Sequence, residues 1–390
     1  MKDMINNLDF SYKNDKGHIY DNRSLMRNLF FIHTPMQLLV AQQIIRQENL
    51  HENIMLYGYV DDNVHFLKLY DLTVIDEFWD AKVAMSQVAR WAIISRRHII
   101  RDCFRVYRNY RFISQIIRHY NIDTIFLGDM KNISCQLAAM SFHRKRLRIC
   151  FFEEGNGHYV MNPDYGKGGN FIDKIYAVFI DMFYYRPFYG VPFGYVSYWK
   201  GFTLSDLPID VRYSFVPFYH EPFDKLVTYQ PLFSKKLTEF LNEDVKQLNT
   251  NHCTLLLSSP CYVGNDNYLQ PYVKTIINYA KSLRDTKLHI KFHPRDTQDI
   301  REMIMKQLDD NGINYQLIGI SQNIPVEYYL QYIHYEKIVF FFCSTFYYNG
   351  YLFPKTEFVS ILRDYYNNCK EAGSVNTKEI EYQLKLIPEE

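Results

Sequence analysis

Two adjacent carboxylates, Glu153 and Glu154, stand between the apolar run RICFF and Gly155. If the run is a strand, its successive side chains point in opposite directions, so one carboxylate can face a ligand while the protein holds the other. Gly155 permits the sharp turn that this needs. A carboxylate with restricted solvation is a suitable general base for a hydroxyl group. A capped turn at the start of the next element is the alternative interpretation.

A histidine followed by proline, His293-Pro294, comes directly after the predicted strand KLHIKF. Proline biases the residue before it toward an extended conformation, so the imidazole should project beyond the strand end. Histidine can be charged near neutral pH, and it can stabilise or protonate a departing phosphate. A histidine satisfied within a turn is the alternative, and the neighbouring Arg295 and Asp296 can be ordinary loop charges.

Hydroxyl and carboxylate groups also stand where a nucleotide could bind. Ser344 and Thr345 follow KIVFFFC, and hydroxyls with free N–H groups at a helix start can hold a phosphate, although a plain helix cap is the commoner explanation. Glu327 follows Pro325 in the first turn of a predicted helix. It can accept ribose hydroxyls, or it can simply interact favourably with the helix dipole.

A further polar cluster begins with Ser258 and Ser259 at the end of the run CTLLLSS. The loop that follows contains Asp266, which is a second candidate base. A cluster of Gly, Asn and Asp is more often just a turn.

The elements that must position these residues alternate between strand and helix patterns. Strands are predicted at 29–35, 53–61, 72–79, 124–129, 147–155, 253–259, 287–294, 315–319 and 337–345. In the first half, helices are predicted at 36–47, in long segments over 82–119, and from the strand at 124–129 through residue 140. In the second half they are predicted at 271–283, 300–312 and 325–333, and after residue 345. Thr34 is placed to cap the first helix, and Pro35 fits its first turn.

This alternation predicts parallel sheets covered by helices on both faces, which is an α/β fold. Two such units flank an irregular region at 160–235, the layout expected of the GT-B architecture, in which two Rossmann-like domains face a central cleft. We expect a flexible arm over 1–28, an acceptor-side Rossmann-like domain with the irregular middle and linker over 29–235, and a nucleotide-sugar-binding Rossmann-like domain over 236–390. Ligands of such sheets lie beyond the carboxyl ends of the strands.

Composition excludes several classes of protein. The chain has 390 residues, enough for two domains, a net charge of +1, and seven scattered cysteines without a CxxC pair, which indicates reduced thiols in a cytoplasm. It has neither the apolar segment of a signal peptide nor a run of roughly 18 apolar residues, so we expect a cytoplasmic protein with at most peripheral contact to the inner membrane. The absence of GxGxxG after an early strand, of a P-loop and of HExxH or Cys/His clusters argues against a dehydrogenase, a P-loop ATPase and a zinc site.

The order and spacing of these motifs resemble the bacterial sialyltransferases of GT-B shape. The relevant groups are glycosyltransferase family 52, the lipooligosaccharide sialyltransferases, and the bacterial polysialyltransferases. The resemblance extends from about Leu29 to about Tyr348. It rests on the acidic-acidic-Gly element at 153–155, the His-Pro element at 293–294, the Ser/Thr pair at 344–345 and the opening FIHTPMQLL.

The resemblance implies an inverting transfer from CMP-sialic acid, with no metal and no cofactor besides this donor. It assigns Glu153 or Glu154 as the base, with Glu153 favoured by the family pattern, and His293 as the group that assists loss of CMP. Some members of family 52 place a base in the loop where Asp266 stands here. Ser344 and Thr345 would hold the phosphate and Glu327 the ribose, and the donor-binding set is completed by Pro294, Ser258 and Ser259.

Residues 90–118 are strongly basic, with eight arginines and only Asp102 as an acid. Near-helical spacing predicts one basic face, formed by Arg90, Arg97, Arg101, Arg105 and Arg108. Much of another, apolar face is expected from Ile93, Ile94, Ile100, Phe104 and Tyr107. A solvated helix face is the ordinary explanation, but the charge also fits anionic lipid or a polyanionic acceptor such as polysialic acid, and we favour the acceptor. No recognition motif supports nucleic acid.

The expected function is therefore a sialyltransferase that extends a sialylated or polysialic acid glycan for capsule or surface polysaccharide. The expected partners are a nucleotide-sugar donor, an anionic glycan acceptor and, peripherally, an anionic membrane. Three alternatives stay open: a lipooligosaccharide sialyltransferase acting on a terminal galactose, another GT-B transferase that uses a UDP- or GDP-sugar, and a non-enzymatic nucleotide- or glycan-binding protein.

Overall fold

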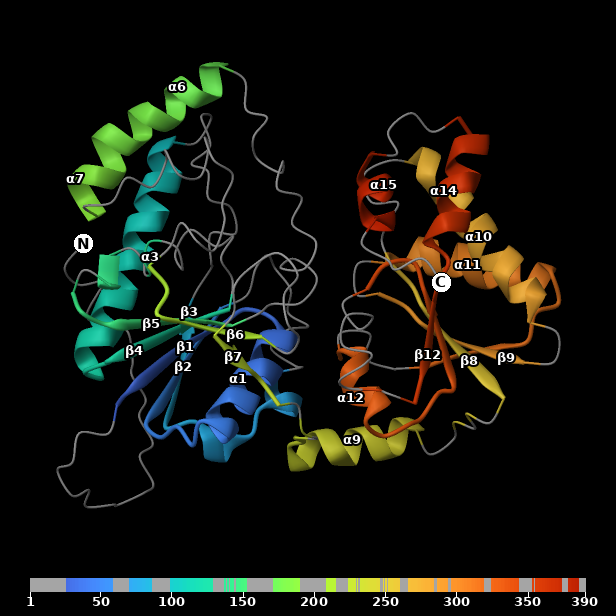
Figure 1. Cartoon of the computed structure of the whole chain (residues 1–390), viewed down its shortest axis with the longest axis horizontal. Coiled ribbons are helices and arrows are strands. Elements are labelled where there is room, and N and C mark those ends of the chain that lie inside the picture. The colour runs from blue at the N-terminus through green and yellow to red at the C-terminus, as the bar shows by residue number, and fades with distance from the viewer. Residues whose placement is uncertain are drawn as a thin grey trace.

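Two parallel β-sheets organise the chain, one in each half (Figure 1). Helices lie around each sheet, and α9 (Lys235–Val245) runs between the two halves. The computed structural model describes residues 26–58, 70–85, 99–128, 137, 139, 141–143, 145–152, 171–189, 208–214, 224–228, 230, 232–245, 248, 250, 252–259, 266–283, 286–293, 296–318, 324–343, 353, 355–373 and 378–385.

The first sheet has seven strands. In spatial order they are β3 (Ala81–Met85), β2 (Asn53–Gly58), β1 (Asn28–Ile32), β4 (Thr124–Leu127), β5 (Arg148–Phe152), β6 (Val211–Ser214) and β7 (Lys225–Leu226). The chain winds outward from β1 in one direction and then restarts on its other side with β4, and both pairings are parallel. This Rossmann-like order creates a switch point between β1 and β4, where ligands of such sheets bind.

Helices α1 (Pro35–Gln47) and α3 (Ile99–His119) cover opposite faces of this sheet. Phe30 of β1 packs in the cluster that contains the apolar residues of α1, whereas Phe31 packs in the cluster that contains those of α3. All five residues of β1 are buried, as expected for a parallel strand covered on both sides.

The start of α1 follows the sequence prediction. Thr34 Oγ1 accepts a hydrogen bond from the main-chain N–H of Gln37 at 3.2 Å, and Pro35 occupies the first helical turn. The Gln37 side chain returns to the main-chain N–H of Thr34, which completes a capping box. This local chemistry fixes the turn that follows the carboxyl end of β1.

The second sheet has five strands. In spatial order they are β10 (Tyr315–Leu317), β9 (Lys287–Lys291), β8 (Cys253–Leu257), β11 (Lys337–Phe340) and β12 (Glu357–Ser360), with a switch point between β8 and β11. Its helical segments are η4 (Asp266–Tyr268), α10 (Leu269–Ser282), α11 (Gln298–Asp310), α12 (Val326–Leu330), α14 (Leu362–Glu371) and α15 (Lys378–Leu384). Apolar residues of α10, α11, α14 and α15 pack on one face, and Leu330 of α12 packs on the other.

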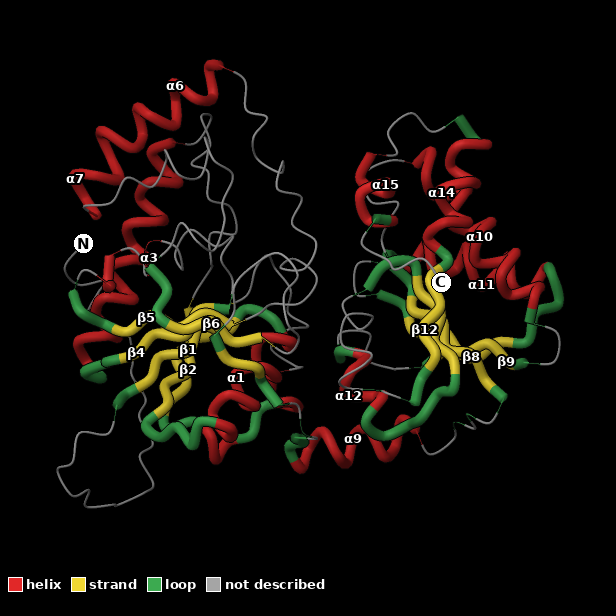
Figure 2. Tube along the Cα trace, in the orientation of Figure 1, coloured by secondary structure: helices red, strands yellow, loops and turns green. Residues whose placement is uncertain are grey.

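Two Rossmann-like units, each with a parallel sheet, confirm the predicted α/β fold of GT-B type. The central cleft and the domain boundary at 235/236 stay predictions. The two halves do touch: α9 contributes Leu237 and Leu241 to an apolar cluster that also holds Leu39 of α1 and Tyr328 of α12. In Figure 2, α12 lies on the side of the second half that faces the first.

Two predicted elements near residue 80 are wrong. Residues 72–79 were predicted as a strand, but Asp76–Phe78 form the 3-10 turn η1, and the strand β3 comes later, at the start of the segment predicted as helical. Val74 and Trp79 are buried in the cluster beneath α1. The strand-like spacing of apolar residues over 72–79 therefore arises because the apolar side chains of a turn pack into the core.

The prediction of irregular structure over 160–235 is also wrong for its described parts. They include the helical segments α6 (Phe171–Ile180), η2 (Asp181–Tyr185) and α7 (Arg186–Tyr189), and the strands β6 and β7 that extend the first sheet. Strands of four and two residues are too short to show a period. β6 forms by pairing with the edge of β5, and β7 by pairing with β6. The four-residue strand β12 pairs with β11 in the same way and was also missed.

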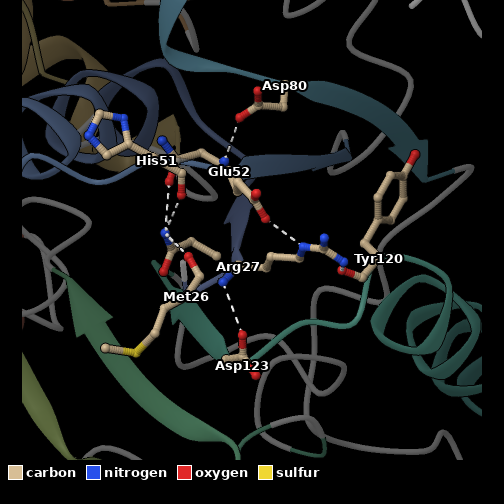
Figure 3. A network of polar contacts seen from close by, with 9 residues as sticks. Met26, Arg27, His51, Glu52, Asp80, Tyr120 and Asp123 are labelled. Atoms are coloured by element: carbon tan, nitrogen blue, oxygen red, sulfur yellow. Dashed lines mark hydrogen bonds and ion pairs between the residues drawn. The ribbon is translucent and has the colours of Figure 1, made fainter. Parts of the chain in front are cut away.

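A polar network closes the amino ends of β1, β2 and β4 (Figure 3). Arg27 donates to Glu52 Oε2 at 2.5 Å and to the carbonyl of Tyr120 at 3.2 Å, and its main-chain N–H donates to Asp123 Oδ2 at 3.1 Å. Next to it, the buried Asn28 amide contacts Asn53 Oδ1 at 3.0 Å. The network stabilises the edge of the sheet opposite to the one where ligands of this fold bind.

Candidate active site

The carboxyl ends of β8, β9 and β11 meet at one corner of the second sheet, and hydrogen bonds connect them. The main-chain N–H of Ser258 donates to the carbonyl of Lys291 at the end of β9, at 3.1 Å. The Ser259 hydroxyl donates to the carbonyl of Phe342, just beyond β11, at 3.0 Å. The predicted pair Ser258 and Ser259 therefore lies beside the switch point of this sheet, where α/β folds bind their ligands.

A buried carboxylate holds the turn that carries His293. The main-chain N–H of His293 donates to Asp296 Oδ2 at 2.9 Å and to Ser258 Oγ at 2.6 Å, and Ser258 Oγ donates to the same carboxylate oxygen. The N–H of Asp296 donates to the carbonyl of His293 at 3.0 Å. Asp296 is only 2% exposed. These bonds use the main chain of His293, so they fix the position of the residue without engaging its imidazole.

Basic side chains occupy alternate positions leading to the end of β9. His289 is fully buried, with Nδ1 2.7 Å from the hydroxyl of Tyr335. Burial, with a smaller effect of the Lys287 charge, lowers the pKa of His289 to about 4, so this ring is neutral near pH 7. Lys291 is 6% exposed and its Nζ lies 5.5 Å from the centre of the Tyr329 ring. Lys291 and His293 therefore bring two basic groups to the strand end.

Glu327 stands in the first turn of α12, as predicted, and is 4% exposed. Tyr329, two residues further along the same helix, contacts the Lys291 side chain. Glu327 thus lies on the face of the sheet that carries Lys291 and His293. The helix itself is shorter than the predicted span 325–333, since it ends at Leu330.

The carboxyl edge of the first sheet is tightly packed. Gly128 follows β4, and a Cβ added there would lie 2.7 Å from the Phe152 ring and 2.9 Å from Gln37 Cδ. Gln37 Oε1 also accepts a hydrogen bond from the N–H of His33 at 2.5 Å. Phe152 ends β5 and directly precedes Glu153. The chain therefore enters the predicted carboxylate pair from a fixed, buried position at the ligand-binding edge.

One apolar cluster connects α1 of the first half with α12 of the second. Leu39, from the helix that follows β1, packs there with Tyr328 and Tyr329 of α12. Tyr329 in turn lies against Lys291 at the end of β9. A continuous path of contacts thus runs from the edge of the first sheet to the strand end that carries His293.

Several predicted site residues lie outside the described part of the chain. They are Glu153, Glu154, Pro294, Ser344, Thr345, Arg90 and Arg97. Asp266 begins η4, directly before α10, and only its main chain is described. Their proposed roles therefore stay predictions.

Arg101, Arg105 and Arg108 follow one another at helical spacing on α3, as predicted, and they contribute to neither sheet corner. The apolar face predicted for this segment is partly wrong, because Ile100 is 83% and Phe104 62% exposed. The first turns of α3 pack against α7 and η2 through other residues, among them Cys103 and Tyr107. The periodicity of the sequence predicted the helix. It did not predict which side of its first turns packs against other elements.

Two residues of this site were missed or undervalued from the sequence. Asp296 was weighed as an ordinary loop charge, yet it is the buried acceptor of the His293 turn. Lys291 was not considered. The polar residues at alternate positions 289, 291 and 293 of an otherwise apolar run were the available signal for a polar strand face.

Burial makes poor nucleophiles of four described thiols, Cys103, Cys150, Cys253 and Cys369. In the described part of the chain, Cys103, Cys150, Cys253, Cys343 and Cys369 are free. Burial raises the pKa of Cys103 to about 11 and that of Cys150 to about 12. Among the residues that the structure describes, no three His, Cys, Asp or Glu side chains cluster as a metal site would need, and no helix is long and apolar enough to cross a bilayer.

Comparison with known families decides the class of this site. The model of the alpha-2,8-polysialyltransferase family matches residues 28–362. The chain belongs to that family. It is therefore a glycosyltransferase of the sialyltransferase group, and the resemblance seen in the sequence is confirmed. The match includes the carboxyl edges of both sheets and the helix α3.

More distant similarities concern overall shape. The UDP-GlcNAc 2-epimerase from Neisseria meningitidis bound to UDP-GlcNAc is 12% identical, with a TM-score of 0.45, over 81% of this chain and 78% of that one. The spinosyn rhamnosyltransferase SpnG is also 12% identical, with a TM-score of 0.45, over 93% and 95% of the two chains. No curated protein matches the sequence. TM-scores this low support no conclusion about function.

Proposed function

We propose that the chain is an inverting, metal-independent polysialyltransferase that transfers sialic acid from CMP-sialic acid to the end of a sialylated glycan. Its membership of the alpha-2,8-polysialyltransferase family supports the class of donor and product. The observation that carries the proposal is the fixed main chain of His293, which Asp296 and Ser258 hold at the carboxyl end of β9. This is the edge where nucleotides bind in such sheets.

In the proposed reaction a base takes the proton of the acceptor hydroxyl, and the hydroxyl oxygen attacks the anomeric carbon of the sialyl group. The bond from that carbon to the phosphate oxygen of CMP breaks, and its electron pair stays on the phosphate. Attack from the side opposite to CMP inverts the anomeric configuration. Negative charge therefore grows on the phosphate, and the imidazole of His293 stabilises it or donates a proton to it.

Glu153 is the proposed base. Its neighbour Phe152 is fully buried against Gly128 at the carboxyl edge of the first sheet, which gives the acidic pair a rigid starting point. Glu154 and Asp266 are the alternative bases. Asp266 would act from the second half, where η4 leads into α10.

The donor is proposed to lie along the corner of the second sheet. Ser259, bonded to the carbonyl of Phe342, stands beside the segment that continues to Ser344 and Thr345, the proposed phosphate contacts. Glu327 is the proposed ribose contact, and the donor-binding set is completed by Ser258 and Pro294. In this arrangement His293 supplies the positive charge that a metal provides in other transferases.

The acceptor is proposed to be an oligosialic or polysialic chain of a capsule or surface polysaccharide. Family membership supports this choice over a terminal galactose of lipooligosaccharide. Contacts of the acceptor with Arg90, Arg97, Arg101, Arg105 and Arg108 stay predictions.

The test is a donor and acceptor panel with the purified chain. We expect CMP release and chain extension from CMP-sialic acid with oligosialic acceptors, little with lactose, none with UDP- or GDP-sugars, and no effect of EDTA. His293→Gln should lower kcat by about 10²–10⁴-fold, and so should the variant of the true base among Glu153→Gln, Glu154→Gln and Asp266→Asn. Full activity of all four variants would refute the assignment of the site, and preference for lactose would refute the acceptor.

A further inference from the structure

Exposed apolar side chains are concentrated on two neighbouring helical segments of the first half. Ten large apolar residues are exposed among those that the structure describes, and seven of them belong to α3 and to the continuous helical segment α6–η2–α7. We call this the α3/α6 surface, and its residues are Ile100, Phe104, Ile175, Phe179, Met182, Phe183 and Phe188. A concentration of this kind on a folded protein marks an interaction surface.

The packing of the α6–η2–α7 segment explains why these side chains point outward. Its opposite side carries Ile180, Tyr185 and Tyr189, which are buried against Val106 of α3. The Tyr184 hydroxyl donates to the carbonyl of Cys103 and lies 2.6 Å from the Tyr189 hydroxyl. Figure 1 shows α6 and α7 beside α3, at the outer end of the first half. The segment is thus firmly attached, and its apolar outer side is a fixed part of the fold.

The exposed charge on the same elements is positive. Arg101, Arg108 and Arg111 are exposed on α3, and the side chain of Arg186 on α7 is 61% exposed. The two acids whose side chains the structure describes on these elements pair with arginines, and Asp102 lies 3.3 Å from Arg101. Asp181 is buried and accepts a hydrogen bond from Arg186 at 2.9 Å.

Apolar and basic groups share one stripe of α3. Ile100, Phe104, Arg108 and Arg111 recur at intervals of four, four and three residues, so they lie on the same side of the helix. Aromatic and aliphatic side chains flanked by arginines are the composition of a helix face that lies in a membrane interface.

We propose that the α3/α6 surface docks onto an anionic lipid bilayer. The apolar side chains enter the boundary between headgroups and acyl chains, and the arginines contact lipid phosphates. No segment needs to cross the bilayer for this mode of attachment. The apolar residues of this surface belong to neither carboxyl sheet edge, so their variants test docking separately from the transfer reaction. Arg101 and Arg108 are also predicted acceptor contacts, and a parallel binding assay with oligosialic acid distinguishes the two roles.

Other occupants fit the surface less well. A polyanionic glycan would use the arginines, but it offers no apolar area to cover Ile175, Phe179 and Met182. A second copy of the chain would cover the apolar residues, but a twofold contact would bring like-charged arginines against each other, which is unfavourable.

The first experiment is sedimentation of the full chain with vesicles made of equal parts of phosphatidylglycerol and phosphatidylcholine. We expect the triple variant Phe179→Ser/Met182→Ser/Phe183→Ser to bind about a hundredfold more weakly. Arg101→Gln, Arg108→Gln and Arg111→Gln should each weaken binding about fivefold. Matched exposed residues elsewhere, changed as Leu226→Ser/Leu317→Ser and Lys281→Gln/Lys306→Gln, should have no effect.

A second measurement uses the unchanged protein, so it does not depend on how a variant folds. Met182 and Met26 are exposed to the same degree, at 56% and 57%. We expect vesicles to protect Met182 from oxidation and to leave Met26 reactive. Equal oxidation of the two with vesicles bound overturns the proposal. The proposal is also wrong if the unchanged chain is a dimer that dissociates in the triple serine variant while vesicle binding stays the same. It is likewise wrong if the variants lose binding to oligosialic acid only.

Discussion

The carboxylate of Asp296 lies 2.9 Å from the main-chain nitrogen of His293, and the nitrogen of Asp296 lies 3.0 Å from the carbonyl of His293. A buried acid thus holds both ends of a tight turn whose first residue is the proposed acid of the reaction. Ser258, from the neighbouring strand, shares the same carboxylate oxygen. The position of His293 is therefore set by a residue that has no need to touch the substrate.

Replacing this carboxylate should separate positioning from chemistry. Asp296→Ala leaves the buried His293 N–H and the Ser258 hydroxyl without their acceptor, so we expect the free energy of unfolding to fall by about 1–3 kcal/mol. We also expect kcat to fall at least about tenfold, with a smaller change in KM, because His293 shifts. Urea unfolding and CMP release measure the two effects. Asp299→Ala, an exposed acid in the first turn of α11, is the control, and an unchanged kcat in Asp296→Ala would contradict the positioning role.

The crowded position at Gly128 gives a test of the carboxyl edge of the first sheet. Gly128→Ala places a methyl group 2.7 Å from the Phe152 ring, so we expect about 1–3 kcal/mol of destabilisation and a lower kcat, since Phe152 precedes the proposed base Glu153. The control is Gly312→Ala, where no atom lies within 4 Å but φ is +67°. It should lose about 1–2 kcal/mol from backbone strain alone and keep its kcat. Equal kcat values for the two variants would show that Phe152 does not position Glu153.

His289 should make the fold sensitive to acid. Its pKa is lowered from 6.5 to about 4 in the folded chain, so the unfolded chain binds more protons between these values, and stability is lost as the pH falls through that window. The effect is on the order of 2–3 kcal/mol. In His289→Gln, the slope of unfolding free energy against pH should be shallower from pH 6.5 to 4, as measured by urea midpoints. A slope in His289→Gln equal to that of the unchanged chain would contradict this role of His289.

The amino-end network should matter for stability alone. The Asn28 amide is buried and lies 3.0 Å from both the His51 carbonyl and Asn53 Oδ1. Asn28→Ala should lower the free energy of unfolding by about 1–3 kcal/mol, because these groups lose their partner. We expect kcat and KM to stay at wild-type values, since Asn28 stands at the opposite end of β1 from the proposed site. A marked fall in kcat at a temperature where the variant is folded would argue against this separation.

The sequence by itself determined the alternation of strands and helices in both halves, the cap of α1 at Thr34, and the order of polar residues at strand ends. These features depend on neighbours within a few residues: an apolar run, a capping side chain, a proline after His293. Such short-range chemistry also singled out His293 and, separately, the pair Ser258 and Ser259. The structure brings them to the same strand ends.

Tertiary structure decided what depends on partners far along the chain. The strand β6 exists because β5 leaves an edge to pair with, and β7 exists because β6 does the same. Residues 72–79 became a turn because Trp79 fills the core beneath α1. Asp296 became the anchor of His293 only where Ser258, 38 residues away, meets it. Likewise, Phe104 is exposed because η2 and α7 pack against Val106 and Tyr107 of α3 instead. Burial and long-range pairing are properties of the whole fold, so no local pattern could predict them.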